Sequence, residues 1–147
     1  MDASFQENES KTELEKEERP LAKPWIHCES SARKFGGKAE DYLAIHNHMD
    51  STKGALADNR HRAVTHNAWY IGPDGPLELA MGVTITNSDG KKISVRSIAE
   101  QHILEDFGGF IPTLQDFLCE IQFQPWMNGL GSPPSKKNTL KPIEVSD

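Results

Sequence analysis

Residues 41–71 read DYLAIHNHMDSTKGALADNRHRAVTHNAWYI, and the fold prediction depends mainly on this stretch. Apolar residues recur within it at helical spacing, which predicts a helix with one buried face. We therefore expect one long helix over residues 45–71. Gly54 is its weak point, since a glycine inside a helix costs about 1 kcal/mol relative to alanine. The helix should end at the breaker sequence GPDGP, residues 72–76.

The rest of the domain is expected to consist of shorter helices and one hairpin. The hairpin is predicted over residues 83–95, where VTIT and KKISV flank NSDG, whose Asp-Gly pair suits a tight turn. Ser97 and Glu100 form a capping box for a helix that ends near Asp106. Thr113 is expected to cap a further short helix. The predicted fold class is α+β and predominantly α: one long helix plus several shorter helices packed with a single β-hairpin.

The two ends of the chain differ in composition from its centre. Residues 1–24 are acidic and nearly free of large apolar side chains, which predicts a disordered tail. Residues 25–129 are predicted to form a single globular domain, with Trp126 and Met127 folded back onto its core. Residues 130–147 are rich in Pro, Ser and Lys, which predicts a flexible C-terminal tail.

Charge and composition limit the classes of function. The chain has 147 residues and a net charge of −6, which argues against binding nucleic acid by bulk electrostatics. Its two cysteines form no CxxC pair, as is typical of free thiols in a reducing compartment. The N-terminus lacks the apolar region of a signal peptide, and no run approaches the roughly 18 apolar residues of a membrane span. We expect a cytoplasmic protein with neither nucleic acid nor membrane as partner.

One edge of the predicted long helix carries His46, Asp50 and His61. Histidine and aspartate four residues apart rise from adjacent turns toward one point, an arrangement that suits a metal ion. His61, however, would lie about 16 Å beyond Asp50 along a straight helix, too far for one ion to reach both. Either there are two sites, or only part of the set is used, or the helix breaks near Gly54. The alternative is a partly solvated helix edge with local hydrogen bonds.

A second polar stripe carries His48, Asn59 and His66 on the other side of the apolar face. Its spacing is too wide for a single site. It is expected to face solvent, and no role is predicted for either histidine.

The later helix carries a second His-x3-Asp pair, His102 and Asp106. If this helix packs against the long one, the pair would face His46 and Asp50, or His61. Imidazole and carboxylate ligands on facing helices are common for Zn, Mn or Fe. The metal site predicted from the sequence therefore comprises His46, Asp50, His61, His102 and Asp106. The alternative is that the acidic residues of this helix pair only with nearby arginines.

Basic side chains accompany these residues. Lys53 and Arg60 fall on the same side of the predicted helix, and together with Arg62 and Arg96 they could receive a phosphate or carboxylate. Arginine offers the paired donors that phosphate or carboxylate accepts, so Lys53, Arg60 and Arg96 are the candidate anion-binding residues. Structural ion pairs are the alternative. The absence of GxGxxG, P-loop, HExxH and GxSxG leaves the reaction, and whether the protein is an enzyme, open.

The segments SSARKFGGKAEDYLAIH, ADNRHRA, ITNSDGKKISVRSIAEQHILEDFG and IPTLQDFL together resemble a family of small bacterial and phage proteins defined as a domain of unknown function. The resemblance covers residues 25–127 and implies a compact, helix-rich intracellular domain. The family has no activity that the resemblance could imply for this chain. The positions that match the family pattern are His46, Asp50, Lys53, Asp58, Arg60, His61, Arg62, Arg96, Ile98, Glu100, Gln101, His102, Glu105 and Asp106.

Two main functions are consistent with these observations, and a metal-free small-nucleotide binder is a third. The first is a divalent-metal site between two helices that binds, or acts on, a small anionic or phosphorylated ligand. The second is a non-enzymatic interaction or accessory protein with a protein partner. In the second case the same polar residues only hold the helices together, and no cofactor is needed.

Overall fold

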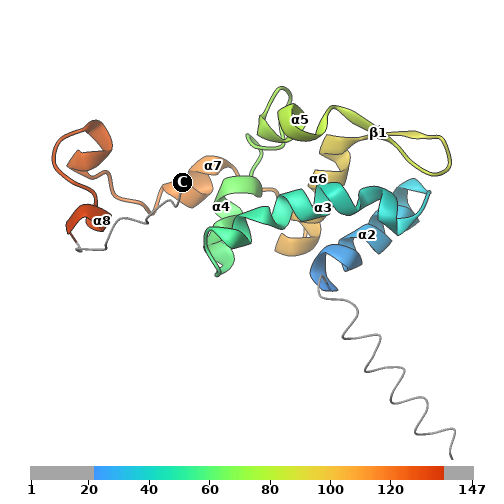
Figure 1. The fold of residues 1–147 in the computed structure, drawn as a ribbon, viewed down its shortest axis with the longest axis horizontal. Coiled ribbons are helices and arrows are strands. Elements are labelled where there is room, and N and C mark those ends of the chain that lie inside the picture. The colour runs from blue at the N-terminus through green and yellow to red at the C-terminus, as the bar shows by residue number, and fades with distance from the viewer. Residues whose placement is uncertain (1–21, 138–147) are drawn as a thin grey trace, which may run out of the picture.

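The computed structural model describes residues 22–137. The protein is mostly helical with one two-stranded antiparallel sheet, so the α+β, predominantly α class is confirmed (Figure 1). The acidic tail was predicted over residues 1–24. Its first 21 residues lie outside the described part, whereas its last three begin the first described helix. Residues 138–147 of the predicted C-terminal tail also lie outside it.

Three helices form the centre of the molecule: α2 (Ala22–Phe35), α3 (Leu43–Asp50) and α6 (Val95–Phe107). Each packs against the other two. Between them and the neighbouring segments lie the buried apolar side chains Cys28, Tyr42, Ile45, Met49, Ile71, Leu77, Ile93, Val95, Ile98, Ala99 and Ile103. Seven of these eleven side chains lie on the three helices, so these helices supply most of the buried core.

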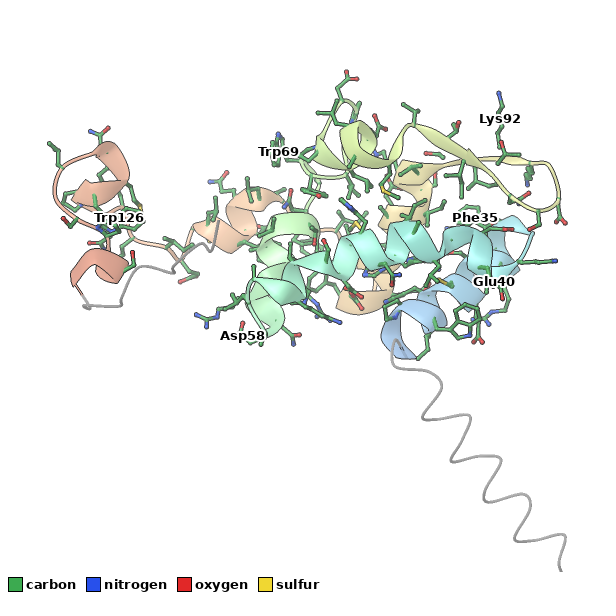
Figure 2. The ribbon with its side chains drawn as sticks, in the orientation of Figure 1. Phe35, Glu40, Asp58, Trp69, Lys92 and Trp126 are labelled. Carbon is green, nitrogen blue, oxygen red and sulfur yellow. The ribbon has the colours of Figure 1, made fainter. Side chains whose placement is uncertain are left out.

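The expected continuous helix over residues 45–71 is wrong. Helix α3 ends at Asp50 and is followed by two 3₁₀ turns, η2 (Ser51–Gly54) and η3 (Asn59–His61), and by α4 (Arg62–Thr65). Residues 51–60 have no buried side chain, so a straight helix there would have had no apolar face to pack. Helical backbone begins again after Asp58, which caps η3 because its carboxylate accepts a hydrogen bond from the backbone N–H of Arg60. Figure 2 labels Asp58 on this exposed loop.

This break has a direct consequence for the histidines. The chain turns back after α3, and α4 packs against α3. The end of α4 therefore lies beside the end of α3 instead of several helical turns farther along a single axis.

The hairpin is present within the predicted range. After α5 (Pro76–Met81), β1 (Thr84–Thr86) pairs with β2 (Lys92–Ser94), with Ile85 opposite Ile93. Gly90 supplies the positive φ of the turn, at 78°. Ser94, rather than the expected Ser97, caps α6, since its side chain accepts from the backbone N–H of Ser97.

The hairpin tip is fastened to η1 (Ala39–Tyr42) by Asp41. The carboxylate of Asp41 accepts from the backbone N–H groups of Lys38 and Ser88, both at 2.8 Å, and from the Ser88 hydroxyl at 2.6 Å. Asp89 in turn accepts from the backbone N–H of Gly37 at 2.8 Å. Every contact in this Asp41 clamp joins a donor to an acceptor.

The chain after α6 extends away from the three central helices. Thr113 caps α7 (Leu114–Leu118) as expected, and η4 (Pro125–Asn128) and α8 (Pro134–Lys137) follow. Figure 1 places these last two elements apart from the other helices. Trp126 is 37% exposed and lies outside the core, so the expectation that it folds back is wrong. Within residues 22–137, no helix has the length and apolar character that a membrane span requires.

Candidate metal centre

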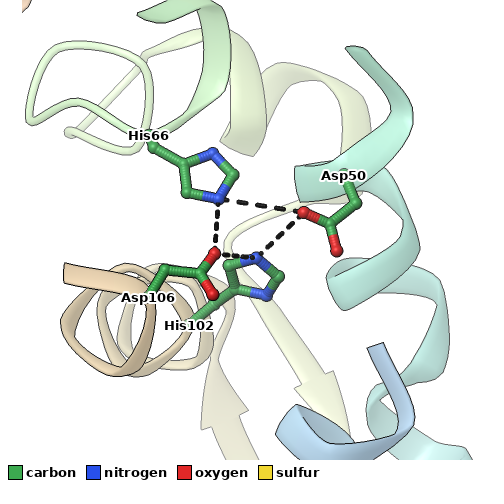
Figure 3. A group of neighbouring side chains, drawn as sticks. All are labelled: Asp50, His66, His102 and Asp106. Atoms are coloured by element: carbon green, nitrogen blue, oxygen red, sulfur yellow. Dashed lines mark hydrogen bonds and ion pairs between the residues drawn. The ribbon is translucent and has the colours of Figure 1, made fainter. Parts of the chain in front are cut away.

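Asp50, His66, His102 and Asp106 meet where α3, α4 and α6 converge (Figure 3). Asp50 is the last residue of α3, and His66 follows α4 directly. His102 and Asp106 are four residues apart on α6 and so present their side chains from adjacent turns. Each of the four could supply one ligand atom to a metal ion, and these atoms lie within 4.8 Å of one another.

The separations of these atoms match a metal coordination shell. His66 Nε2 lies 3.0 Å from Asp106 Oδ2 and 3.8 Å from Asp50 Oδ1. His102 Nε2 lies 3.2 Å from Asp106 Oδ2 and 3.3 Å from Asp50 Oδ1. Ligands bonded at about 2.0–2.1 Å to a tetrahedral ion are about 3.3 Å apart. The four observed separations bracket that value.

The centre is largely shielded from water. His66 and His102 are fully buried, and the side chains of Asp50 and Asp106 are 10% and 9% exposed. Burial opposes the charge on Asp106, but the contacts of this carboxylate with His102, His27 and His66 outweigh burial and lower its pKa. Burial also opposes the charge on Asp50, yet its contact with His102 lowers the pKa of that carboxyl as well. Both groups are therefore carboxylates at neutral pH.

The proton on His66 is fixed by Thr65. The Thr65 hydroxyl donates its single proton to the Met49 carbonyl, at 2.7 Å. The same oxygen lies 2.8 Å from His66 Nδ1, so it must accept a hydrogen bond from Nδ1–H. Since burial lowers the pKa of His66, the ring carries one proton only. That places a lone pair on Nε2, the atom that faces Asp106 and Asp50.

A longer relay fixes the proton on His102. The Ser31 hydroxyl donates to Gln101 Oε1 at 2.7 Å, so it accepts from His46 Nε2, also at 2.7 Å. Burial lowers the pKa of His46 to about 3, which leaves this ring neutral with its lone pair on Nδ1. His102 Nδ1 lies 2.9 Å from that atom and must therefore donate to it. When His102 is neutral, its lone pair is then on Nε2, which is directed between the two carboxylates.

The inner surface of the centre thus places acceptors against acceptors. Two imidazole lone pairs face two carboxylate oxygens at close range, an arrangement that a cation between them would satisfy. His102 Nε2 is one of three buried nitrogen or oxygen side-chain atoms without a hydrogen-bond partner among the described residues. Hydrogen bonds on the outer nitrogens that orient imidazoles are characteristic of metal sites in proteins.

The second oxygen of Asp106 faces a different group of residues. His27 Nε2 lies 3.2 Å from Asp106 Oδ1, and its Nδ1 lies 3.1 Å from Glu105 Oε2. Arg62 Nη2 is 3.7 Å from the same Asp106 oxygen. Gln101 donates to Glu105 and to the carbonyl of His27, which ties α2 to α6. These contacts hold the Asp106 carboxylate in place from outside the centre.

The structure brings together three of the five residues in the predicted metal site: Asp50, His102 and Asp106. His46 lies behind His102 and orients it. His61 lies outside the group of four, with its ring edge-on to His66 at 5.9 Å between centroids.

His66 is the residue that sequence reasoning missed, because it was expected to face solvent. Only the break after Asp50 brings it to the centre. His48 has a separate contact, 2.7 Å from the hydroxyl of Tyr70.

The predicted anion-binding residues do not converge. Lys53 Nζ lies 3.7 Å from Asp50 Oδ2, beside the centre. Arg60 forms a two-pronged pair with Asp58 on the exposed loop. Arg96 pairs with Glu100 one turn along α6. Of the three, Lys53 is the residue that lies next to the metal centre.

Comparison with known proteins places the chain in a family. Residues 22–127 match the domain of unknown function DUF6915, and the chain belongs to this family. Neither curated proteins nor solved structures yield a match.

Proposed function

We propose that this protein binds one divalent transition-metal ion through Asp50, His66, His102 and Asp106. The observation that carries the proposal is the direction of the two imidazole lone pairs. The outer nitrogen of each ring donates a hydrogen bond, from His66 Nδ1 to the Thr65 hydroxyl and from His102 Nδ1 to His46. The lone pair of each ring is therefore on Nε2, which lies 3.0–3.8 Å from carboxylate oxygens of Asp50 and Asp106. A cation bound between these two nitrogens and two oxygens would have all four atoms as ligands.

The ligand set indicates which ions fit. Two imidazoles and two carboxylates suit Zn, Mn or Fe, since imidazole selects borderline transition metals and carboxylate suits harder ones. A four-coordinate zinc ion would be held by protein ligands alone, as in structural sites. Mn or Fe would take further ligands, and an ion with such an open position activates water or polarises a bound anion.

The test is the metal content of protein purified without a histidine tag. Wild type should retain about one equivalent, measured by inductively coupled plasma mass spectrometry. His66→Ala and His102→Ala should retain almost none. His48→Ala is the matched control, since His48 is a partly buried histidine outside the centre, and it should retain the wild-type amount. Equal metal in all four proteins, or none in wild type, would refute the proposal.

A second candidate is a metal-free ion-pair network in a protein that acts through a protein partner. It is favoured by His102: burial opposes its charge, but Asp106 and Asp50 outweigh burial and raise the pKa of this imidazole. A protonated His102 could satisfy both carboxylates by itself. The lowered pKa of His66 opposes this candidate, because a neutral His66 keeps its lone pair against Asp106. The network predicts folding and stability that do not respond to metal or chelator.

A further inference from the structure

Two buried, unpartnered atoms lie on consecutive residues beside the metal centre. In the described part of the chain they are His61 Nε2 and Arg62 Nε, in addition to His102 Nε2 within the centre itself. Buried polar atoms without partners are rare in folded proteins and call for an explanation. Both residues adjoin the centre, since the His61 and His66 ring centroids are 5.9 Å apart and Arg62 Nη2 lies 3.7 Å from Asp106 Oδ1, so a ligand at the centre is a candidate partner for both atoms.

The free atom of His61 is a hydrogen-bond acceptor. The Thr52 hydroxyl donates to the carbonyl of His61 at 3.1 Å, so it accepts from His61 Nδ1 at 2.9 Å. A neutral ring then has its lone pair on Nε2. The residue is 2% exposed, and its ring meets that of His66 at 89°. A ligand at this position would have to offer a hydrogen.

The free atom of Arg62 is a donor. Its guanidinium lies over the ring of Phe107, with Cζ 5.4 Å from the ring centroid, and its Nη2 is 3.7 Å from Asp106 Oδ1. The side chain is 13% exposed, so it is held close to the centre rather than in solvent. Its Nε–H requires an acceptor, and guanidinium groups are well matched to the oxygens of phosphate.

The charges around the centre favour an anion. Asp50 and Asp106 together neutralise a divalent ion. Lys53 beside Asp50 and Arg62 beside Asp106 then outnumber Glu105, so the surroundings have an excess of positive charge. Arg60 does not contribute, because Asp58 already takes its guanidinium.

We propose that the His61–Arg62 side of the centre binds a phosphate group, with one oxygen on the ion, another accepting from Arg62, and a protonated oxygen or metal-bound water donating to His61. This inference rests on the metal site proposed above. It specifies the anionic ligand class and assigns its recognition to Arg62 and His61. A phosphate monoester and free phosphate share this chemistry, and the experiment separates them.

The experiment titrates inorganic phosphate, and separately phenyl phosphate, into protein loaded with one equivalent of the metal it retains, with binding followed by calorimetry. Wild type should bind phosphate. Arg62→Gln should bind it about 10–100-fold more weakly, as expected for loss of a charge-assisted hydrogen bond. His61→Phe, which keeps the ring but not its nitrogen, should also bind more weakly. Arg60→Gln is the matched control and should bind as wild type does.

Metal content is measured for each protein, so the two proposals fail in different ways. A wild type that holds the metal but does not bind either probe overturns the phosphate proposal and leaves the metal site standing. Equal phosphate affinity in Arg62→Gln and wild type overturns it too. A wild type without metal refutes both.

If Arg62→Gln loses its metal, Arg62→Lys takes its place in the experiment. This variant keeps the charge but lacks the guanidinium, so it should bind phosphate more weakly than wild type. Binding of phenyl phosphate identifies the monoester as an accepted form, whereas binding of inorganic phosphate alone identifies the free anion.

Discussion

Asp41 and Asp106 are both carboxylates that join remote parts of the chain, yet their surroundings differ in kind. Asp41 faces only donors: two backbone N–H groups and the Ser88 hydroxyl. Asp106 Oδ2 faces two imidazole nitrogens, and in the neutral form of each ring the single proton is on the opposite nitrogen. The clamp at Asp41 is complete as it stands, whereas the centre at Asp106 is where we propose that a cation binds.

This difference distinguishes a structural polar cluster from the proposed binding site. Counting polar residues would rank the two clusters together, since each links several elements. Following each proton to its acceptor distinguishes them, because only the centre leaves lone pairs opposed. The hydroxyls of Thr65 and Ser31 are decisive here, since each has one proton, and its destination sets the state of the neighbouring ring.

Paired substitutions at the two carboxylates test this contrast most strongly. Asp106→Asn should abolish metal retention, reducing it from about one equivalent to near zero, because a neutral amide is a poor ligand for these ions. Asp41→Asn should leave metal retention unchanged. Both are measured by metal analysis of tag-free protein. If folded Asp41→Asn lost its metal, the distinction between the Asp41 clamp and the metal centre would be contradicted.

The second largest effect is expected on stability when the metal is removed. A ligand that binds only the folded state at 1,000 times its dissociation constant stabilises it by about 4 kcal/mol. Chelation of wild type should therefore lower the midpoint of thermal unfolding by many degrees, while Asp106→Asn should hardly respond. Differential scanning calorimetry with and without chelator provides the measurement. An identical midpoint under both conditions would favour the metal-free network.

The relay behind His102 should have a smaller effect. Ser31→Ala removes the hydroxyl that sets the tautomer of His46, and through it the lone pair on His102. Substitutions that disturb the orientation of a metal ligand typically weaken binding about 10–100-fold. Ser88→Ala, in the Asp41 clamp, should leave the metal affinity unaltered. Competition with a chromogenic chelator would compare the two, and equal affinities would exclude Ser31 from the relay.

The weakest effect concerns pH. Hydrogen bonds from Ser88 and from the backbone of Lys38 lower the pKa of Asp41. A lowered folded-state pKa means that the contribution of Asp41 to stability is fully present above its unfolded pKa, about 3.9, and is lost as pH falls through the folded pKa. The difference in unfolding free energy between wild type and Asp41→Asn, measured in chelator, should therefore shrink below about pH 4. A difference that grows on acidification would contradict this sign.

The sequence was informative where function depends on local spacing. His102 and Asp106 lie on one helix at i and i+4, so periodicity alone was enough to pair them. The hairpin was also predictable, since the Asp-Gly turn and its flanking strands are close in the chain. Asp50 was identified by its position on the same face as His46.

His66 was not predictable in this way, because its position depends on a break in the chain. Helical periodicity records apolar spacing and does not report that residues 51–60 bury no side chain. One signal was available: Asp58 is a favoured N-cap residue, and its presence within the supposed helix favours a restart at that point. The relay through Ser31 and Gln101 joins α2, α3 and α6, so it could be found only from their packing.

The most direct test of the metal centre is a crystal of the metal-loaded protein measured at the absorption edge of the ion. We expect an anomalous peak about 2.0–2.2 Å from His66 Nε2, His102 Nε2, Asp50 Oδ1 and Asp106 Oδ2. A map with no peak there, and with direct hydrogen bonds joining these four side chains, would contradict it.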